Sequence, residues 1–174
     1  DGDASLPEIA RSALLALGAH LEALAGEIRA LERQLMVWHR ADPTSQRLET
    51  ILGVGLITAT ALAASVSDPS VFKSSRQFAA FLGLVPRQNS SGGKDRLGRI
   101  SKMGDRYLRK LLVVGATSVI RRAGSNPTKT GAWVRSLMER KPARVVTVAM
   151  ANKTARISWA VMTRGEAYRA SPIA

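Results

Sequence analysis

The chain has 174 residues, of which 45% are hydrophobic and only 5% aromatic, so aliphatic side chains and alanine must fill its core. Lysine and arginine number 26 against 13 acidic residues, and this net charge of +13 favours a nucleic-acid partner over a generically basic soluble protein. The absence of cysteine excludes disulfides and thiolate zinc sites, and no apolar stretch approaches the ~20 residues that span a bilayer. No segment combines a basic face with exposed large aromatic residues, which argues against a membrane partner.

The same absences, together with the lack of a visible signal peptide, predict a cytoplasmic protein. Because the first residue is Asp1 rather than methionine, we expect the chain to be a fragment or a processed product.

The first expected element is a coiled-coil helix within residues 1–42. Its apolar residues recur at alternating steps of three and four, on a narrow seam of Leu14, Leu17, Leu21, Leu24, Ile28, Leu31, Leu35 and Trp38. A helix that packs on its own domain usually has a wider apolar face. We therefore predict self-association as a dimer or a tetramer, or pairing with an upstream helix of the same protein.

Residues 46–168 are predicted to form a small helical domain, and residues 169–174 a flexible tail. After a break at Ala41–Ser45, we expect two short helices within 48–66, a helix over 74–82, an irregular loop over 84–100, and helices over 101–122, 130–140 and 142–163. The pattern contains no convincing strand, and the predicted fold class is all-α.

Periodicity also predicts which faces of the two longest helices of this domain are buried. The first should bury Leu108, Leu111, Leu112, Gly115 and Val119. The last should bury Val145, Val148, Ala149, Asn152, Ala155, Trp159 and Met162.

The segment 48–66 matches a helix-hairpin-helix element around Gly53-Val54-Gly55. Gly53 and Gly55 would let the backbone approach a phosphate closely, and the first amides of the following helix would face that anion. A tight turn that packs helix on helix, without a ligand, explains the same residues equally well.

The densest basic region spans residues 86–110, with eight basic residues against two acidic ones. We predict that it forms a phosphate-binding surface rather than only a solvated face. Its members are Arg87, Lys94, Arg96, Arg99, Lys102, Arg106, Arg109 and Lys110, and the last three have the spacing of one helical face.

Few catalytic groups accompany this surface. Acidic residues are scarce and both histidines lie on the first helix, so neither a metal site nor a Ser-His-Asp arrangement is predicted. A serine that attacks a phosphodiester is the remaining option, with arginines holding the phosphate. Ser91, directly before Gly92-Gly93, is the serine most free to approach a DNA backbone, and Ser90 is the fallback. Without further information, a solvated serine that has no catalytic role explains these residues as well.

The run from Leu48 to Ala116 contains the motifs GLVPRQNSSGG and GRISKMGDRYLRK. This run strongly resembles the C-terminal domain of the insertion-sequence one-ten/eleven-eleven class of transposases, which are bridge-RNA-guided DNA recombinases. The stretch RVVTVAMANKTARISWAVMTRGEAY is similar to the last helix of that family. The resemblance covers about residues 48–168.

The resemblance implies a serine that becomes covalently linked to DNA, at the position of Ser91 after Gly83-Leu84-Val85-Pro86-Arg87. It also implies an N-terminal RuvC-like domain that holds Mg²⁺ through acidic residues. We expect this chain to lack that domain, and thus to hold half of a composite active site and no cofactor. The implied partners are DNA, a guide (bridge) RNA and further copies of the protein; the alternative is a non-catalytic nucleic-acid-binding and oligomerisation module.

Overall fold

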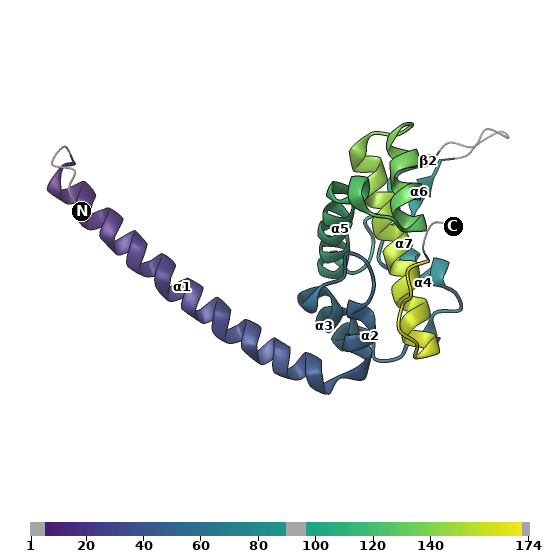
Figure 1. The fold of residues 1–174 in the computed structure, drawn as a ribbon, viewed down its shortest axis with the longest axis horizontal. Helices are drawn as coiled ribbons and strands as arrows, with labels where there is room; N and C mark the ends of the chain where they lie inside the picture. The colour runs from purple at the N-terminus through teal and green to yellow at the C-terminus, as the bar shows by residue number, and fades with distance from the viewer. Residues whose placement is uncertain (1–5, 90–96, 172–174) are drawn as a thin grey trace. The chain divides into compact units, whose positions relative to one another are not determined.

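The computed structural model describes residues 6–89 and 97–171, and the chain divides into two compact units at the boundary between Trp38 and His39. Figure 1 shows the elements in chain order. They are α1 (Glu8–Ala41), α2 (Pro43–Glu49), α3 (Leu56–Ser65), η1 (Pro69–Val71), α4 (Ser75–Phe81), β1 (Pro86–Gln88), β2 (Leu97–Ile100), α5 (Arg106–Arg121), η2 (Ala123–Ser125), α6 (Lys129–Met138) and α7 (Ala143–Arg164). The all-α class is confirmed.

The expectation that the chain has no strand is wrong in one place. β1 and β2 form an antiparallel pair in which Pro86 lies opposite Ile100 and Gln88 opposite Leu97, with an irregular register between them. Strands of three and four residues are too short to show an alternating pattern, and β1 is exposed along its whole length, so the sequence carries no burial signal there.

The first unit consists of the greater part of α1, whose apolar seam is exposed. The seam side chains other than Leu35 are between 41% (Trp38) and 69% (Leu21) exposed. Nothing in the described part of this single chain covers these side chains, and the coiled coil therefore stays a prediction.

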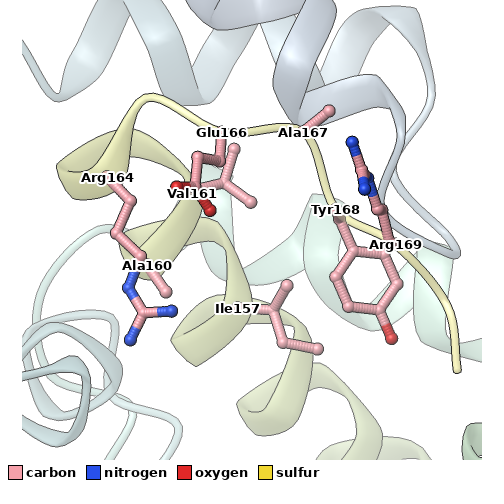
Figure 2. Close-up of a pocket in the computed structure, with 8 residues that line it drawn as sticks. All are labelled: Ile157, Ala160, Val161, Arg164, Glu166, Ala167, Tyr168 and Arg169. Atoms are coloured by element: carbon pink, nitrogen blue, oxygen red, sulfur yellow. The ribbon is translucent and has the colours of Figure 1, made fainter.

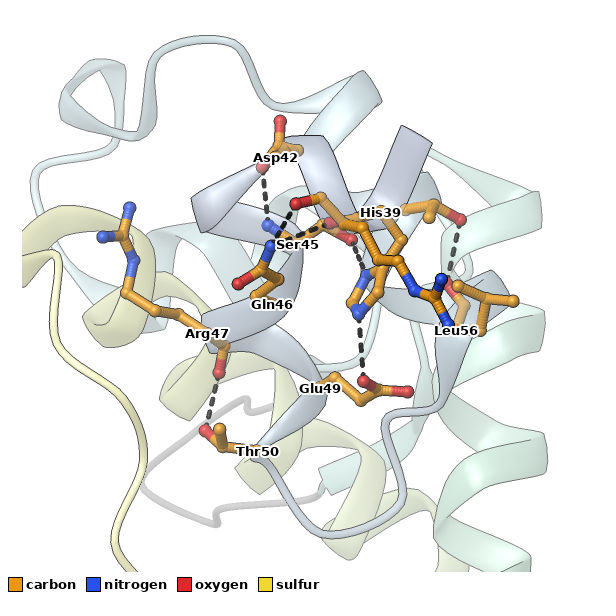
Figure 3. Close-up of polar contacts among 10 residues, drawn as sticks. His39, Asp42, Ser45, Gln46, Arg47, Glu49, Thr50 and Leu56 are labelled. Carbon is orange, nitrogen blue, oxygen red and sulfur yellow. Dashed lines mark hydrogen bonds and ion pairs between the residues drawn. The ribbon is translucent and has the colours of Figure 1, made fainter. Parts of the chain in front are cut away.

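A buried polar cluster joins the end of α1 to α2 (Figure 3). His39 is only 5% exposed, and its Nδ1 lies 2.7 Å from Ser45 Oγ while its Nε2 lies 3.0 Å from Glu49 Oε2. Asp42 caps α2 by accepting a hydrogen bond of 2.7 Å from the Ser45 amide, and Pro43 occupies the first turn.

This cluster corrects one expectation, because a Ser-His-carboxylate arrangement does exist in Ser45, His39 and Glu49. Ser45 is fully buried, so its hydroxyl has no access to a substrate. The two hydrogen bonds of His39 tie Ser45 and Glu49 of α2 to the end of α1.

α7 is the centre of the second unit and packs against α2, α4, α5 and α6. Figure 1 shows α5 and α7 next to each other, as their contacts require. The core that these helices enclose is mostly aliphatic; its largest fully buried side chains include Phe78, Leu82, Leu84, Leu108, Leu112 and Met150.

The buried face of α7 is rotated from the predicted one. The helix buries Val146, Met150, Ala151, Thr154, Ala155, Ser158 and Val161, of which only Ala155 was expected. The buried face includes Thr154 and Ser158, whose polar side chains weaken the apolar period on which the prediction relied. Val145, expected inside, is 51% exposed.

α5 begins later than the predicted start at residue 101 or 102. Lys102 and Gly104 both have positive φ, which interrupts a right-handed helix, and Asp105 then caps the helix by accepting a hydrogen bond of 2.9 Å from the Leu108 amide. Leu108, Leu112 and Val119 are buried as predicted, Ala116 is buried in addition, and Leu111 and Gly115 are half-buried.

The helices described over residues 6–89 and 97–171 include none that is both long and apolar enough to cross a membrane.

Candidate nucleic-acid interface

The hairpin of β1 and β2 holds the two ends of the segment that contains the predicted nucleophile. Gln88 and Leu97 lie opposite each other at the open end of the described strands. Ser91 and the fallback Ser90, like Lys94 and Arg96, lie outside the described residues. The structure therefore describes the strands that flank this segment, and not the serines themselves.

Two glycines bring the chain before β1 into contact with the chain after β2. At Gly104, where φ is +77°, a Cβ atom would lie 1.7 Å from the carbonyl oxygen of Phe81. At Gly83, where φ is +67°, a Cβ atom would lie 2.2 Å from the carbonyl oxygen of Met103. Only glycine satisfies both the conformation and the space at these positions.

Backbone hydrogen bonds fasten the same crossing. The Ser101 amide donates to the Val85 carbonyl at 2.8 Å, and the Lys102 amide donates to the Gly83 carbonyl at 3.1 Å. Arg87 adds a side-chain bond, because its Nη2 donates to the Ser101 carbonyl at 3.2 Å. The base of the hairpin is thus held on both sides of the segment that it carries.

Arg109 stands apart from the other predicted phosphate-binding residues. Its Nη1 donates to the carbonyl oxygens of Leu82 at 2.9 Å and Met103 at 3.0 Å. Because these carbonyls belong to the two chain segments that cross below the hairpin, Arg109 ties the segments together. The half-buried Arg109 thus has a structural role, and its contact with a phosphate stays a prediction.

The remaining described cations of the basic region face solvent. Arg87, Arg99, Lys102, Arg106 and Lys110 are all exposed. Arg106 and Lys110 extend from the first turns of α5, while Arg99 and Lys102 line a groove beside α7. The structure thus gathers these charges around the hairpin and the start of α5, which is the surface that a phosphate backbone would require.

The sequence reasoning missed three further cations that line the same groove. Arg144, Lys153 and Arg156 come from α7, more than thirty residues after the basic region. Their spacing along α7 gives little signal, because they are scattered through a mainly apolar helix. Only the groove, which residues of α7 and β2 line together, shows that these three cations lie near Arg99 and Lys102.

The two glycines of the turn Gly53-Val54-Gly55 lie in different surroundings. Gly53 has a φ of +83° and packs on α5, where a Cβ added to Gly115 would lie 1.9 Å from the Gly53 carbonyl oxygen. Gly55 is exposed with no atom near its would-be Cβ, and no side chain caps the α3 helix that follows it. Helix packing therefore accounts for Gly53, and phosphate contact by Gly55 stays a prediction, as does the helix-hairpin-helix element.

A second hollow, of about 700 Å³, lies where the chain leaves α7 (Figure 2). Ile157 and Val161 of α7 form one side, and Glu166 to Arg169 form the other. The Tyr168 amide donates to Thr50 Oγ1 at 2.8 Å, which fastens this segment to the turn after α2. None of the residues predicted to bind nucleic acid lines this hollow.

Comparison with known proteins gives a consistent result. The Transposase IS116/IS110/IS902 family matches residues 45–131, which include the hairpin, the glycine crossing and the basic region. The chain is 48% identical over 166 residues to a protein of Pseudomonas aeruginosa named "Probable family 20 transposase", covering 95% of this chain and 49% of that protein. It is 42% identical over 163 residues to the transposase for insertion sequence element IS1328 of Yersinia enterocolitica, covering 94% and 49%.

A third relative is the transposase for insertion sequence element IS1111A of Coxiella burnetii, 45% identical over 138 residues, which are 79% of this chain and 38% of that protein. The chain belongs to the IS116/IS110/IS902 family of transposases. It spans less than half the length of these three relatives.

Proposed function

We propose that this chain is the DNA-binding and serine-bearing portion of an insertion-sequence transposase. The hydroxyl oxygen of Ser91 attacks a DNA phosphorus atom, and a covalent serine–DNA phosphodiester forms as the bond from phosphorus to one deoxyribose oxygen breaks. The serine gives up its proton, and the departing deoxyribose oxygen takes one. The exposed arginines around the hairpin hold the phosphate and stabilise its developing negative charge.

One observation supports this function above all. The hairpin that carries the segment 90–96 is fastened at its base by Gly83, Gly104 and Arg109, and exposed cations surround it. A nucleophile must be held close to its phosphate in a fixed orientation, and a rigid support below a short segment is suited to that task.

The partners of the whole protein are part of the same proposal. DNA and a guide RNA bind the cationic surface, and the seam of α1 joins copies of the protein. The Mg²⁺ that the family resemblance implies finds no site among the described residues, which include no cluster of three or more histidine or acidic side chains able to hold a metal ion. We therefore propose that it is held by a RuvC-like domain in the remainder of the protein, and no step here depends on it.

The nucleophile is tested by Ser91→Ala in the protein expressed from its complete natural reading frame. Incubation with element-end DNA, followed by denaturing electrophoresis, should show a covalent protein–DNA adduct for the native protein and at least ~100-fold less for the variant. The matched control is Ser90→Ala, which should form the adduct at near-native levels.

A normal adduct from Ser91→Ala would refute the assignment. If Ser90→Ala were the inactive variant, the nucleophile would be Ser90. Salt-dependent DNA binding by the native protein and by both variants, without an adduct from any of them, would instead favour a non-catalytic binding and oligomerisation module.

The exposed seam supports the oligomeric part of the proposal. The double variant Leu21→Gln, Ile28→Gln should convert the protein from an oligomer to a monomer in sedimentation, because it removes apolar surface from two layers of the coiled coil that lie one heptad apart. The control is Leu15→Gln, Val37→Gln, since these side chains are 65% and 69% exposed but lie off the seam. Equal oligomeric states of the two double variants would contradict a role of the seam in assembly.

A further inference from the structure

The face of α7 that periodicity predicted to be buried instead borders an open groove. Val145, Val148 and Ala149 line this groove from α7, and Ile100 of β2 and Trp133 of α6 line it from other elements. The groove has a volume of about 1350 Å³. This volume exceeds the range of ~300–1,000 Å³ that is usual for small-molecule sites, so a segment of a macromolecule fits it better.

The surface inside the groove is largely aliphatic. Ile100, Val145, Val148 and Ile157 contribute to it, and Val145 remains 51% exposed. Apolar side chains gathered in one hollow gain free energy when a partner covers them. The described chain provides no such cover.

The charge around the groove has one sign. Five of the described lining residues are cationic, namely Arg99, Lys102, Arg144, Lys153 and Arg156, and none of the described lining residues is acidic. Burial lowers the pKa of the Lys153 ammonium, because lost hydration disfavours its charged form. A partner that brought acidic groups to this rim would compensate these charges, whereas a second copy of a chain with a net charge of +13 would not.

The low aromatic content of the groove favours a protein partner over single-stranded nucleic acid. Unpaired bases usually bind by stacking on aromatic side chains. Trp133 is the only aromatic residue among the described lining residues, and Lys153 Nζ already lies over its ring, 4.5 Å from the centroid. An aliphatic surface with a cationic rim instead matches an amphipathic helix that has apolar residues on one face and acidic residues beside them.

We propose that the groove between α7, β2 and Trp133 is a docking site for an acidic amphipathic α-helix of a protein partner. The apolar face of that helix covers Val145, Val148 and Ile157, and its carboxylates pair with Arg144, Lys153 and Arg156. This site borders the proposed phosphate-binding residues Arg99 and Lys102, and we expect the helix to dock there without Ser91 or a DNA substrate.

The test uses a fluorescent, helix-forming peptide of ~18 residues with leucine at helical spacing on one face and glutamate elsewhere. Fluorescence anisotropy should show binding to the native chain that weakens about tenfold or more in Val145→Asn and in Arg156→Gln. Matched controls are Val114→Asn and Arg121→Gln, which replace exposed residues of α5 outside the groove and should leave the affinity unchanged. Circular dichroism should show that all four variants keep their helices.

Three results would overturn the proposal. The peptide could fail to bind, its affinity could be indifferent to Val145→Asn and Arg156→Gln, or a peptide with lysine in place of glutamate could bind equally well. A single-stranded oligothymidylate serves as a competitor. If it displaced the peptide and its own affinity required Val145, the groove would be a nucleic-acid site instead.

Discussion

Replacing Gly104 with alanine is expected to destabilise the second unit by about 3 kcal/mol or more. Two costs act together in this variant. A residue with a Cβ atom is strained at a φ of +77°, and the new atom would lie 1.7 Å from the carbonyl oxygen of Phe81, so the crossing below the hairpin must open. The midpoint of urea unfolding, followed by circular dichroism, measures the loss.

Gly124→Ala is the matched control, because a Cβ atom added to Gly124 would meet no other atom within 4 Å and the φ of this residue is not positive. This control should change the free energy of unfolding by no more than ~0.5 kcal/mol. Equal midpoints for the Gly104→Ala variant and the native chain would show that the two backbone segments leave room for a side chain at the crossing.

Replacing Arg109 with methionine should lower the free energy of unfolding by about 1–3 kcal/mol, because the carbonyls of Leu82 and Met103 lose their shared guanidinium donor. Methionine keeps an unbranched stem of similar length, so the change acts mainly on these two hydrogen bonds. If the tie positions the segment that carries Ser91, the rate of adduct formation should fall more than DNA affinity does.

The neighbouring Lys110→Met gives the opposite expectation. Lys110 is exposed, so its loss should leave stability unchanged, weaken DNA binding and reduce the salt dependence of binding by about one counterion. Equal stability and equal DNA affinity of the Arg109 and Lys110 variants would contradict a structural role for Arg109 and a surface role for Lys110.

Local signals in the sequence predicted most of the helices. The break at Asp42-Pro43, the heptad spacing of α1 and the punctuation before α6 and α7 each depend on residues near one another in the chain. The late start of α5 and the two short strands escaped prediction. Left-handed conformation at Lys102 and exposed pairing between β1 and β2 become apparent only when distant segments meet.

The candidate site divides in the same way. The family of the chain and the basic region of the site could be inferred from motifs and charge, because these are properties of residue identity and order. The role of Arg109 and the addition of Arg144, Lys153 and Arg156 could not, since each depends on which helix face packs inward.

Residue order alone was enough to establish the helical class, the apolar seam of α1 and the excess of positive charge, because periodicity and composition act over neighbouring residues. Packing between segments far apart in the chain decided the rest: the Gly83–Gly104 crossing, the buried His39 cluster and the open groove beside α7. The physical reason is that close backbone approach and burial are properties of pairs of segments, and neither segment carries that information by itself.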